Sequence, residues 1–242
     1  MVPAKLLRRS TRVIRPRDLE DEYARPRQAL QRMAADAVVL RLAHGYYAVP
    51  PGEWVGNPDW RPQVEAVALG IATADHGVEN VAVVGPSAAR VLGFYPRALS
   101  TAVVSVPVRR SPLSTTVGKI VFWNWLASRL ETQVWRSELG QGRTATTEQA
   151  LLDIAANPRM GDISVTTAEE MLANLALEAD WSHALVLAES NGRHAAYARA
   201  RWFAQPLVPN APTIEGLRHP IARKGLTPRG LVDGKAFGIR DD

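Results

Sequence analysis

The segment from Pro16 to Val49 constrains the fold more than any other part of the chain. Prolines 16 and 26 suit the first turns of two helices, because proline lacks the amide hydrogen that a first turn leaves unbonded. Two runs typical of β-strands follow at 38–42 and 46–49, and the tripeptide Ala43-His44-Gly45 between them is typical of a hairpin turn. The order helix, helix, hairpin predicts a small winged helix-turn-helix module.

The second of these helices, predicted over 26–36, has two contrasting faces. Leu30, Met33 and Ala37 recur at the spacing of one buried side. The other side carries only arginine and glutamine, the residues that most often form paired hydrogen bonds with guanine and adenine edges. We interpret it as a DNA-recognition helix beside a hairpin that contacts phosphate, and expect nine DNA-binding residues: Arg17, Arg25, Arg27, Gln28, Gln31, Arg32, Arg41, His44 and Tyr46.

Positive charge is concentrated in the same segment. The chain has a formal net charge of +5, and residues 1–50 hold ten Lys or Arg against five Asp or Glu. The remaining residues hold nineteen of each sign, so the whole excess lies in the first fifth of the chain. Such an asymmetry is expected of a module that meets a polyanion. A solvated basic arm would have the same charge, and charge alone leaves both interpretations open.

A second domain is predicted after an irregular stretch rich in proline. We place the boundary at residue 62, which gives a winged-helix domain at 1–62 and a mixed α/β domain at 63–242. The second domain is expected to contain an antiparallel sheet, built from strands at 81–84, 102–108, 119–125 and 132–138, and a helical C-terminal part. The predicted helices run over 64–74, 87–93, 148–156, 171–178, 182–190 and 193–205. The fold class is therefore α+β.

Composition excludes several kinds of protein. The chain has no cysteine, so it has no disulfide framework and no thiolate metal site. It has no apolar run of membrane-spanning length and no apolar stretch typical of a signal peptide near its N-terminus. We expect a soluble cytoplasmic protein that does not act at a membrane.

The side chains that could carry catalysis do not form a recognisable set. Gly85-Pro86-Ser87 is similar to the entry segment of nucleotidyltransferases, but no Asp-x-Asp pair follows to bind a metal–nucleotide complex. His183 and His194 lack an acidic partner at metal-ligand spacing. The tryptophans at 123, 125 and 135 alternate on predicted strands and are expected in the core. We expect no enzyme activity, no metal and no cofactor.

Three short motifs resemble a known family. Residues 32–51 (RMAADAVVLRLAHGYYAVPP) are similar to the helix-to-hairpin segment of the AbiEi family of antitoxins from type IV toxin–antitoxin systems. Residues 84–93 (VGPSAARVLG) and 144–153 (TATTEQALLD) are similar to two later helix entries of that family. The chain departs from the family in three ways: Ala37 stands where glycine is usual, Thr147 replaces a proline, and residues 1–14 are expected to form a short first helix.

The resemblance implies an N-terminal winged helix that represses its own operon and a C-terminal domain that counters a nucleotidyltransferase-type toxin. Its partners would be duplex DNA at its own operator and the cognate toxin. Two alternatives remain open. One is a solitary winged-helix repressor without a toxin, and the other is a nucleic-acid-processing enzyme whose winged helix recruits the substrate.

Overall fold

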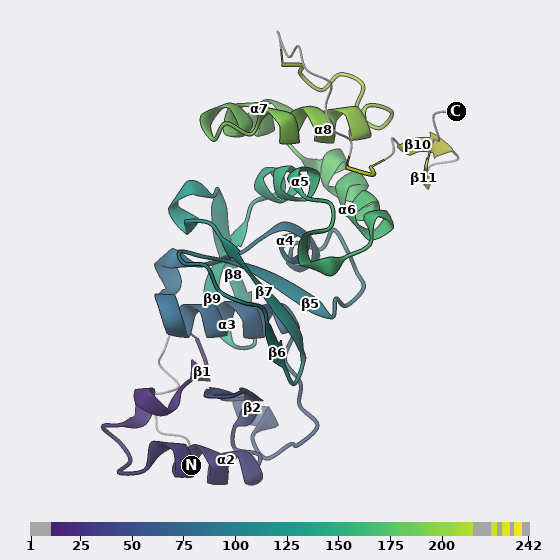
Figure 1. The fold of residues 1–242 in the computed structure, drawn as a ribbon. Coiled ribbons are helices and arrows are strands. Elements are labelled where there is room, and N and C mark those ends of the chain that lie inside the picture. The colour runs from purple at the N-terminus through teal and green to yellow at the C-terminus, as the bar shows by residue number, and fades with distance from the viewer. Residues whose placement is uncertain (1–10, 215–223, 227–228, 233–234, 239–242) are drawn as a thin grey trace. The chain divides into compact units, whose positions relative to one another are not determined.

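The chain is a mixed α+β protein that divides into two compact units in the computed structural model. The structure describes residues 11–214, 224–226, 229–232 and 235–238 (Figure 1). The first unit comprises the chain up to Val83 together with Leu99–Ser128 and Gln133–Thr144, and the second comprises most of the remainder. The boundary predicted at residue 62 therefore falls inside the first unit.

The N-terminal part of the first unit contains a 3-10 helix, an α-helix and a small antiparallel sheet (Figure 1). In chain order these elements are β1 (Val13–Ile14), η1 (Pro16–Leu19), α2 (Pro26–Ala35), β2 (Leu40–Ala43) and β3 (Tyr46–Ala48). Both prolines occupy the first turn of their helix, as predicted, although the first helix is a single 3-10 turn. The expectation of a helix over 1–14 is wrong at residues 13–14, which pair with β3, and residues 1–10 lie outside the described part.

Hydrophobic side chains from β1, η1, α2, β3 and the residues beside the hairpin form one core. Ile14, Leu19 and Leu30 are fully buried in it, with Val39, Tyr47 and Val49, and Met33 packs against its edge. Because α2 contributes only one buried stripe, its remaining surface faces solvent. Ala37, which was expected on the buried face of the helix, lies beyond its end.

The end of α2 has the hydrogen-bond pattern of a Schellman motif. The Val38 amide donates to the Met33 carbonyl at 2.8 Å, and the Ala37 amide donates to the Ala34 carbonyl at 3.2 Å. This motif requires a left-handed residue after the helix, and Ala37 has φ of 52°. The chain thus keeps the glycine-favouring backbone conformation at a position where it has alanine.

A six-stranded mixed sheet forms the rest of the first unit, in the order β6-β7-β5-β4-β9-β8. The strands are β4 (Ala82–Val83), β5 (Thr101–Val106), β6 (Leu113–Thr115), β7 (Gly118–Asn124), β8 (Thr132–Ser137) and β9 (Gly140–Ala145). The sheet was predicted to be antiparallel, and β4 pairs with β5 and β6 with β7 in that way. It is mixed, however, because β5 pairs with β7 and β4 with β9 in parallel. Local alternation sets which face is buried but carries no information on strand direction.

One strand of the sheet was not predicted, and the expected burial of the tryptophans was wrong. The polar, glycine-containing strand β9 was not predicted, since its sequence lacks a β-branched or aromatic run. The tryptophans expected in the core are only partly buried or exposed, and Trp125 is 37% exposed.

Helix α3 (Val64–His76) lies along this sheet and also contacts β1. Gly70 permits that second contact, because a Cβ atom there would lie 2.3 Å from a Val13 methyl group. The short helices η2 (Gly52–Trp54) and η3 (Val78–Asn80) precede and follow α3.

The second unit is mainly helical. Its helices are α4 (Gly85–Val91), α5 (Thr147–Ala156), α6 (Val165–Glu178), α7 (Trp181–Ser190) and α8 (His194–Ala204), with a 3-10 turn η5 (Met160–Asp162). The side chains of Thr146 and Ser164 cap α5 and α6. Further along the chain, β10 (Arg229–Val232) pairs with β11 (Lys235–Gly238) in antiparallel.

A buried carboxylate organises the interior of this unit. Asp153 on α5 is 1% exposed and accepts hydrogen bonds from Arg193 at 2.7 Å, from the Gln149 amide at 2.7 Å and from the Gly85 backbone at 3.3 Å. Burial raises the pKa of Asp153, and its charge and hydrogen-bond partners, chiefly Arg193, counter that rise. One carboxylate thus connects α4, α5 and the start of α8.

We expect Ala37→Gly to increase the free energy of unfolding by about 1 kcal/mol, because glycine adopts the left-handed conformation without a Cβ clash. The matched control is Ala35→Gly, two residues earlier and still in the helix, which should instead cost about 0.5–1 kcal/mol. Urea unfolding followed by circular dichroism measures both. Destabilisation by both substitutions would contradict the strain at Ala37.

We expect Arg193→Gln to destabilise the protein by about 3 kcal/mol at neutral pH, because it leaves a buried carboxylate without its cation. Loss of Arg193 raises the pKa of Asp153 further. When folding raises a carboxyl pKa, the folded state binds the proton more tightly than the unfolded state, and the free energy of unfolding falls as the pH rises through that pKa. The destabilisation by Arg193→Gln should therefore be smaller at pH 4 than at neutral pH. Arg97→Gln breaks an exposed pair with Glu170 and should cost less than about 1 kcal/mol at either pH.

Candidate nucleic-acid interface

A groove in the first unit brings together residues from η1, α2 and the β2–β3 hairpin. It has a volume of about 420 Å³, and four arginines line it. Six of the nine residues predicted to bind DNA are among its lining side chains: Arg17, Arg27, Gln31, Arg41, His44 and Tyr46. They come from three elements that are adjacent only in the folded chain.

The other three predicted residues lie outside the groove, Arg25 at the N-cap of α2 and Gln28 and Arg32 on a neighbouring flank of the helix. Arg25, Gln28 and Arg32 line a second hollow of about 510 Å³ together with Tyr23, Met33 and Asp36. Arg25 and Gln28 also share a small hollow with Arg27. The polar face that the sequence presented as a single surface therefore has two flanks. Arg27 and Gln31 face the hairpin, whereas Gln28 and Arg32 do not.

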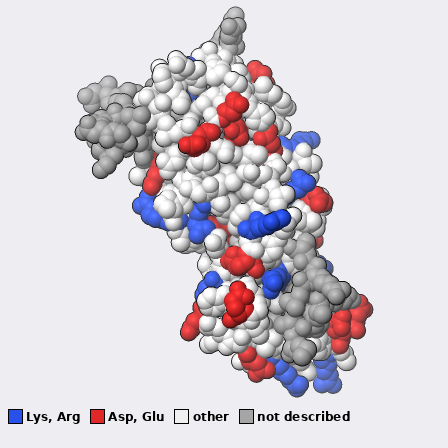
Figure 2. Space-filling view, turned by 180° about the vertical axis from the view of Figure 1, so that it is seen from behind, with Lys and Arg blue, Asp and Glu red and all other residues white. Residues whose placement is uncertain are grey.

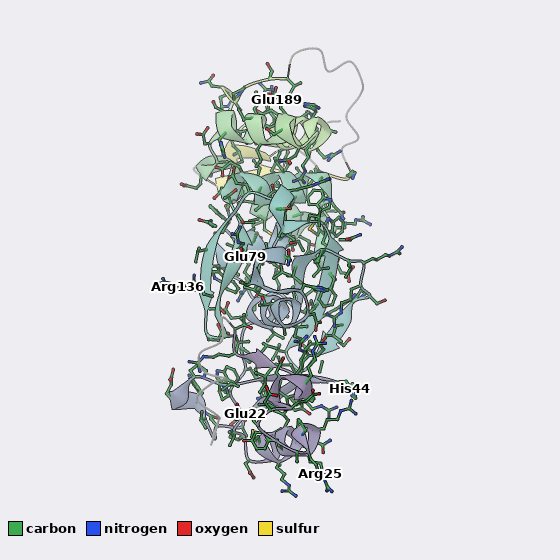
Figure 3. All side chains as sticks on the ribbon, turned by 90° about the vertical axis from the view of Figure 1, so that its left-hand side faces the viewer. Glu22, Arg25, His44, Glu79, Arg136 and Glu189 are labelled. Carbon is green, nitrogen blue, oxygen red and sulfur yellow. The ribbon has the colours of Figure 1, made fainter. Side chains whose placement is uncertain are left out.

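The cationic side chains of both flanks are available to a ligand. Arg27, Arg32 and Arg41 are exposed, and within the described ranges none of them forms an ion pair. Arg17 is 60% exposed and lies 3.9 Å from the Asp75 carboxylate. Figure 3 shows Arg25 at the outer end of α2 and His44 at the hairpin, both on the same side of the N-terminal part.

A cluster centred on Asp75 forms the floor of the groove and holds the hairpin. Asp75 lies near the end of α3 and accepts hydrogen bonds from the Tyr46 hydroxyl at 2.6 Å, from Arg110 at 2.5 Å and from Arg15 at 2.8 Å. Arg110 also donates to the Tyr46 hydroxyl at 3.1 Å and lies 4.2 Å from the centre of the Phe122 ring. We call these four residues, Arg15, Tyr46, Asp75 and Arg110, the Asp75 cluster.

The cluster keeps Tyr46 as a neutral hydrogen-bond donor. Burial and the hydrogen bond to Asp75 raise the pKa of the Tyr46 phenol, and Arg110 only partly opposes them. For Arg15, burial lowers the pKa, but the ion pairs with Asp18 and Asp75 outweigh that and raise it overall. Tyr46 was predicted to contact DNA, but its hydroxyl forms hydrogen bonds within the protein, to Asp75 and Arg110.

The hairpin has a second anchor on the large sheet. The Thr116 amide donates to the Leu42 carbonyl at 2.9 Å, and the Thr116 hydroxyl donates to the Arg41 carbonyl at 3.1 Å. The turn itself is built on Gly45, whose φ of 80° favours glycine. The backbone of Arg41 is thus fixed while its side chain stays exposed.

Charge on the described part of this region is mixed. Lys5, Arg8 and Arg9 lie among the residues outside the described part, so residues 11–50 hold seven basic and five acidic side chains. In Figure 2 blue and red side chains alternate over the N-terminal part of the chain. The region therefore has no uniformly basic face among the residues described, and four of its arginines line the groove together with Glu20 and Asp75.

Three residues of this cluster, Arg15, Asp75 and Arg110, were not predicted as site residues. The spacing of Arg15 and Asp18 is a local signal, since the two side chains and backbones cap η1 reciprocally. Asp75 and Arg110 give no such signal, because their partners lie 29 and more residues away.

Other sites considered from the sequence are not formed among the residues described. There, no three His, Asp or Glu side chains gather to hold a metal ion, and none of the helices is long and apolar enough to cross a membrane. His183 has an acidic partner from a distant segment, Glu131 at 2.6 Å, whose hydrogen bond and charge raise the pKa of His183. This contact is an exposed ion pair rather than a zinc site.

Comparison with known proteins identifies a similar fold. No protein-family model matches the chain, and no curated protein matches it. Among solved structures, the chain is similar to the crystal structure of RV2827C protein from Mycobacterium tuberculosis. The two share 18% sequence identity with a TM-score of 0.54, over 81% of this chain and 72% of that chain. At this identity the likeness concerns the fold alone.

We expect Tyr46→Phe to destabilise the first unit by about 1.5 kcal/mol, because it removes a hydrogen bond to a charged acceptor and leaves the ring in place. Tyr23→Phe provides the control. Tyr23 also packs against the small core, but its hydroxyl makes no hydrogen bond to the described residues, so its loss should cost less than about 0.5 kcal/mol. Equal effects of the two substitutions in urea unfolding would argue against the Asp75 cluster.

Proposed function

We propose that this chain is a DNA-binding transcriptional repressor whose N-terminal winged-helix module binds duplex DNA. The observation that carries the proposal is the groove in which Arg17, Arg27, Gln31, Arg41 and His44 converge from η1, α2 and the hairpin. An exposed helix beside a β-hairpin, with basic and amide side chains between them, suits the phosphate backbone and base edges of a duplex.

The local fold supports the winged-helix assignment. A short helix precedes α2, and α2 leads directly into an antiparallel hairpin whose second strand pairs with β1. Helix α2 buries a single stripe on the small core and leaves both polar flanks open. In winged-helix proteins of this type such a helix enters the major groove while the hairpin contacts the DNA backbone.

The two flanks of α2 suggest different tasks. Arg27, facing the hairpin, is grouped with Arg17 and Arg41, so this flank suits the line of phosphates along one strand. Gln28 and Arg32 lie on the outward flank, away from the hairpin, and have the donors and acceptors that distinguish base pairs. Gln31 lies inside the groove and is therefore a weaker candidate for base recognition than Gln28.

We further propose that the repressor is the antitoxin of a type IV toxin–antitoxin pair, with residues 63–242 countering a nucleotidyltransferase-like toxin. This part rests on the sequence resemblance to AbiEi antitoxins. Co-expression of the full chain with a nucleotidyltransferase-like protein encoded next to it should restore growth. Repression of a reporter without any growth rescue would favour the solitary repressor, and metal-dependent cleavage of DNA or nucleotide transfer by the purified chain would favour an enzyme.

We expect Gln28→Ala to reduce the discrimination between operator and random duplex by about 1–3 kcal/mol, with little change in binding to random duplex. Arg41→Ala should weaken binding to every duplex and reduce the slope of log affinity against log salt by about 0.9, the effect of one lost phosphate contact. Fluorescence anisotropy with labelled duplexes at several salt concentrations measures both effects.

Arg136→Ala is the matched control for charge. Arg136 is an exposed arginine on β8, bonded to Gln141 and away from α2 (Figure 3). Its removal should leave the salt slope unchanged. If Arg136→Ala and Arg41→Ala reduce the slope equally, DNA binding depends on overall charge and the groove is not the site.

A further inference from the structure

We propose that Asp75 is a positioning residue for DNA binding, which holds the hairpin and η1 in the arrangement that forms the groove. The inference rests on the proposed function and extends it, because Asp75 and its partner Arg110 lie outside the predicted DNA-binding domain. DNA binding by residues 1–62 would then depend on a carboxylate and a guanidinium from residues 63–242.

The geometry assigns each oxygen of Asp75 to a different structural task. Oδ1 accepts the Arg15 guanidinium at 2.8 Å, which fixes the start of η1. Oδ2 accepts the Tyr46 hydroxyl at 2.6 Å and Arg110 at 2.5 Å, which fixes the first residue of β3. The Asp75 side chain is only 16% exposed, so these donors replace most of its contact with water.

Arg110 ties this arrangement to the large sheet. Its guanidinium lies over the Phe122 ring on β7 and 5.6 Å from the Tyr46 ring on β3. Tyr46 directly follows Gly45 and is two residues from His44 at the hairpin tip. The position of the Tyr46 hydroxyl therefore sets where the tip stands relative to Arg27 and Gln31 on α2.

Asp75 could affect DNA binding through its charge or through the position of the hairpin, and these two roles predict opposite effects when the charge is removed. Asp75 lines the groove, so its negative charge repels a phosphate that enters. If Asp75 acted through its charge alone, removal of that charge would strengthen DNA binding. If it positions the hairpin, removal of the charge weakens binding, because only the fraction of molecules with a docked hairpin is competent.

The test uses the full chain with Asp75→Asn, which keeps the shape of the side chain and removes its charge. Glu79→Gln is the matched control, since it removes the same charge from an exposed residue of the same unit that pairs with Arg143 at 3.1 Å. Anisotropy is measured with a labelled duplex from the DNA upstream of the gene. We expect Asp75→Asn to weaken binding about three- to tenfold, as for a hairpin docked about 10–30% of the time, and Glu79→Gln to leave it unchanged or slightly stronger.

Hydrogen exchange of the free protein is the second measurement and needs no DNA. Asp75→Asn should speed exchange of the amides of the β2–β3 hairpin and leave α5 to α8 unchanged, whereas Glu79→Gln should alter neither. If Asp75→Asn is too unstable to study, Tyr46→Phe keeps the charge and the ring, and it should weaken binding and speed hairpin exchange in the same direction.

Unchanged or tighter DNA binding by Asp75→Asn, with hairpin exchange as in the wild type, overturns the positioning role while the proposed function stands. Failure of the wild-type chain to bind any duplex overturns the proposed function. In that case, the exchange result still decides whether Asp75 holds the hairpin.

Discussion

The proposed DNA site depends on the meeting of three donors at the carboxylate of Asp75. Arg15 from the start of η1, Tyr46 from the hairpin and Arg110 from the loop after β5 all bond to it. A carboxylate removed from water is stable only when such donors replace its hydration, so each donor is held as firmly as the carboxylate itself. Because α3 carries Asp75 and packs on the large sheet, the hairpin takes its position from that sheet.

This constraint explains how a region of modest net charge can present exposed arginines along one groove. Asp75 and Asp18 neutralise Arg15, and Asp75 also pairs with Arg110. Arg27 and Arg41 have no such carboxylate partner among the residues described, and they remain exposed at the rim. The protein thus uses some arginines to build the groove and leaves others for a ligand.

The sequence predicted much of the local structure and little of the long-range structure. Pro16 and Pro26 begin helices because proline suits the first turn, and Gly45 turns the hairpin because its φ is positive. The parallel pairing of β5 with β7 and the role of Asp75 were not predictable, because both depend on partners distant in the chain. Helical spacing identified the polar residues of α2 but merged two flanks, since only the hairpin distinguishes Arg27 and Gln31 from Gln28 and Arg32.

Local spacing also misplaced Ala37. Spacing placed it on the buried face, whereas the Schellman hydrogen bonds place it beyond the helix in a left-handed conformation. This backbone conformation strains Ala37, and it sets the direction in which the chain leaves α2 for the hairpin.

The groove is tested most directly as the DNA site by a hydrogen-exchange footprint of the full chain with and without duplex DNA from upstream of the gene. We expect slower exchange in η1, α2 and the β2–β3 hairpin, with α5 to α8 unchanged. Bound duplex with slower exchange confined to α5 to α8, and with α2 unaffected, would contradict the assignment of the groove as the DNA site.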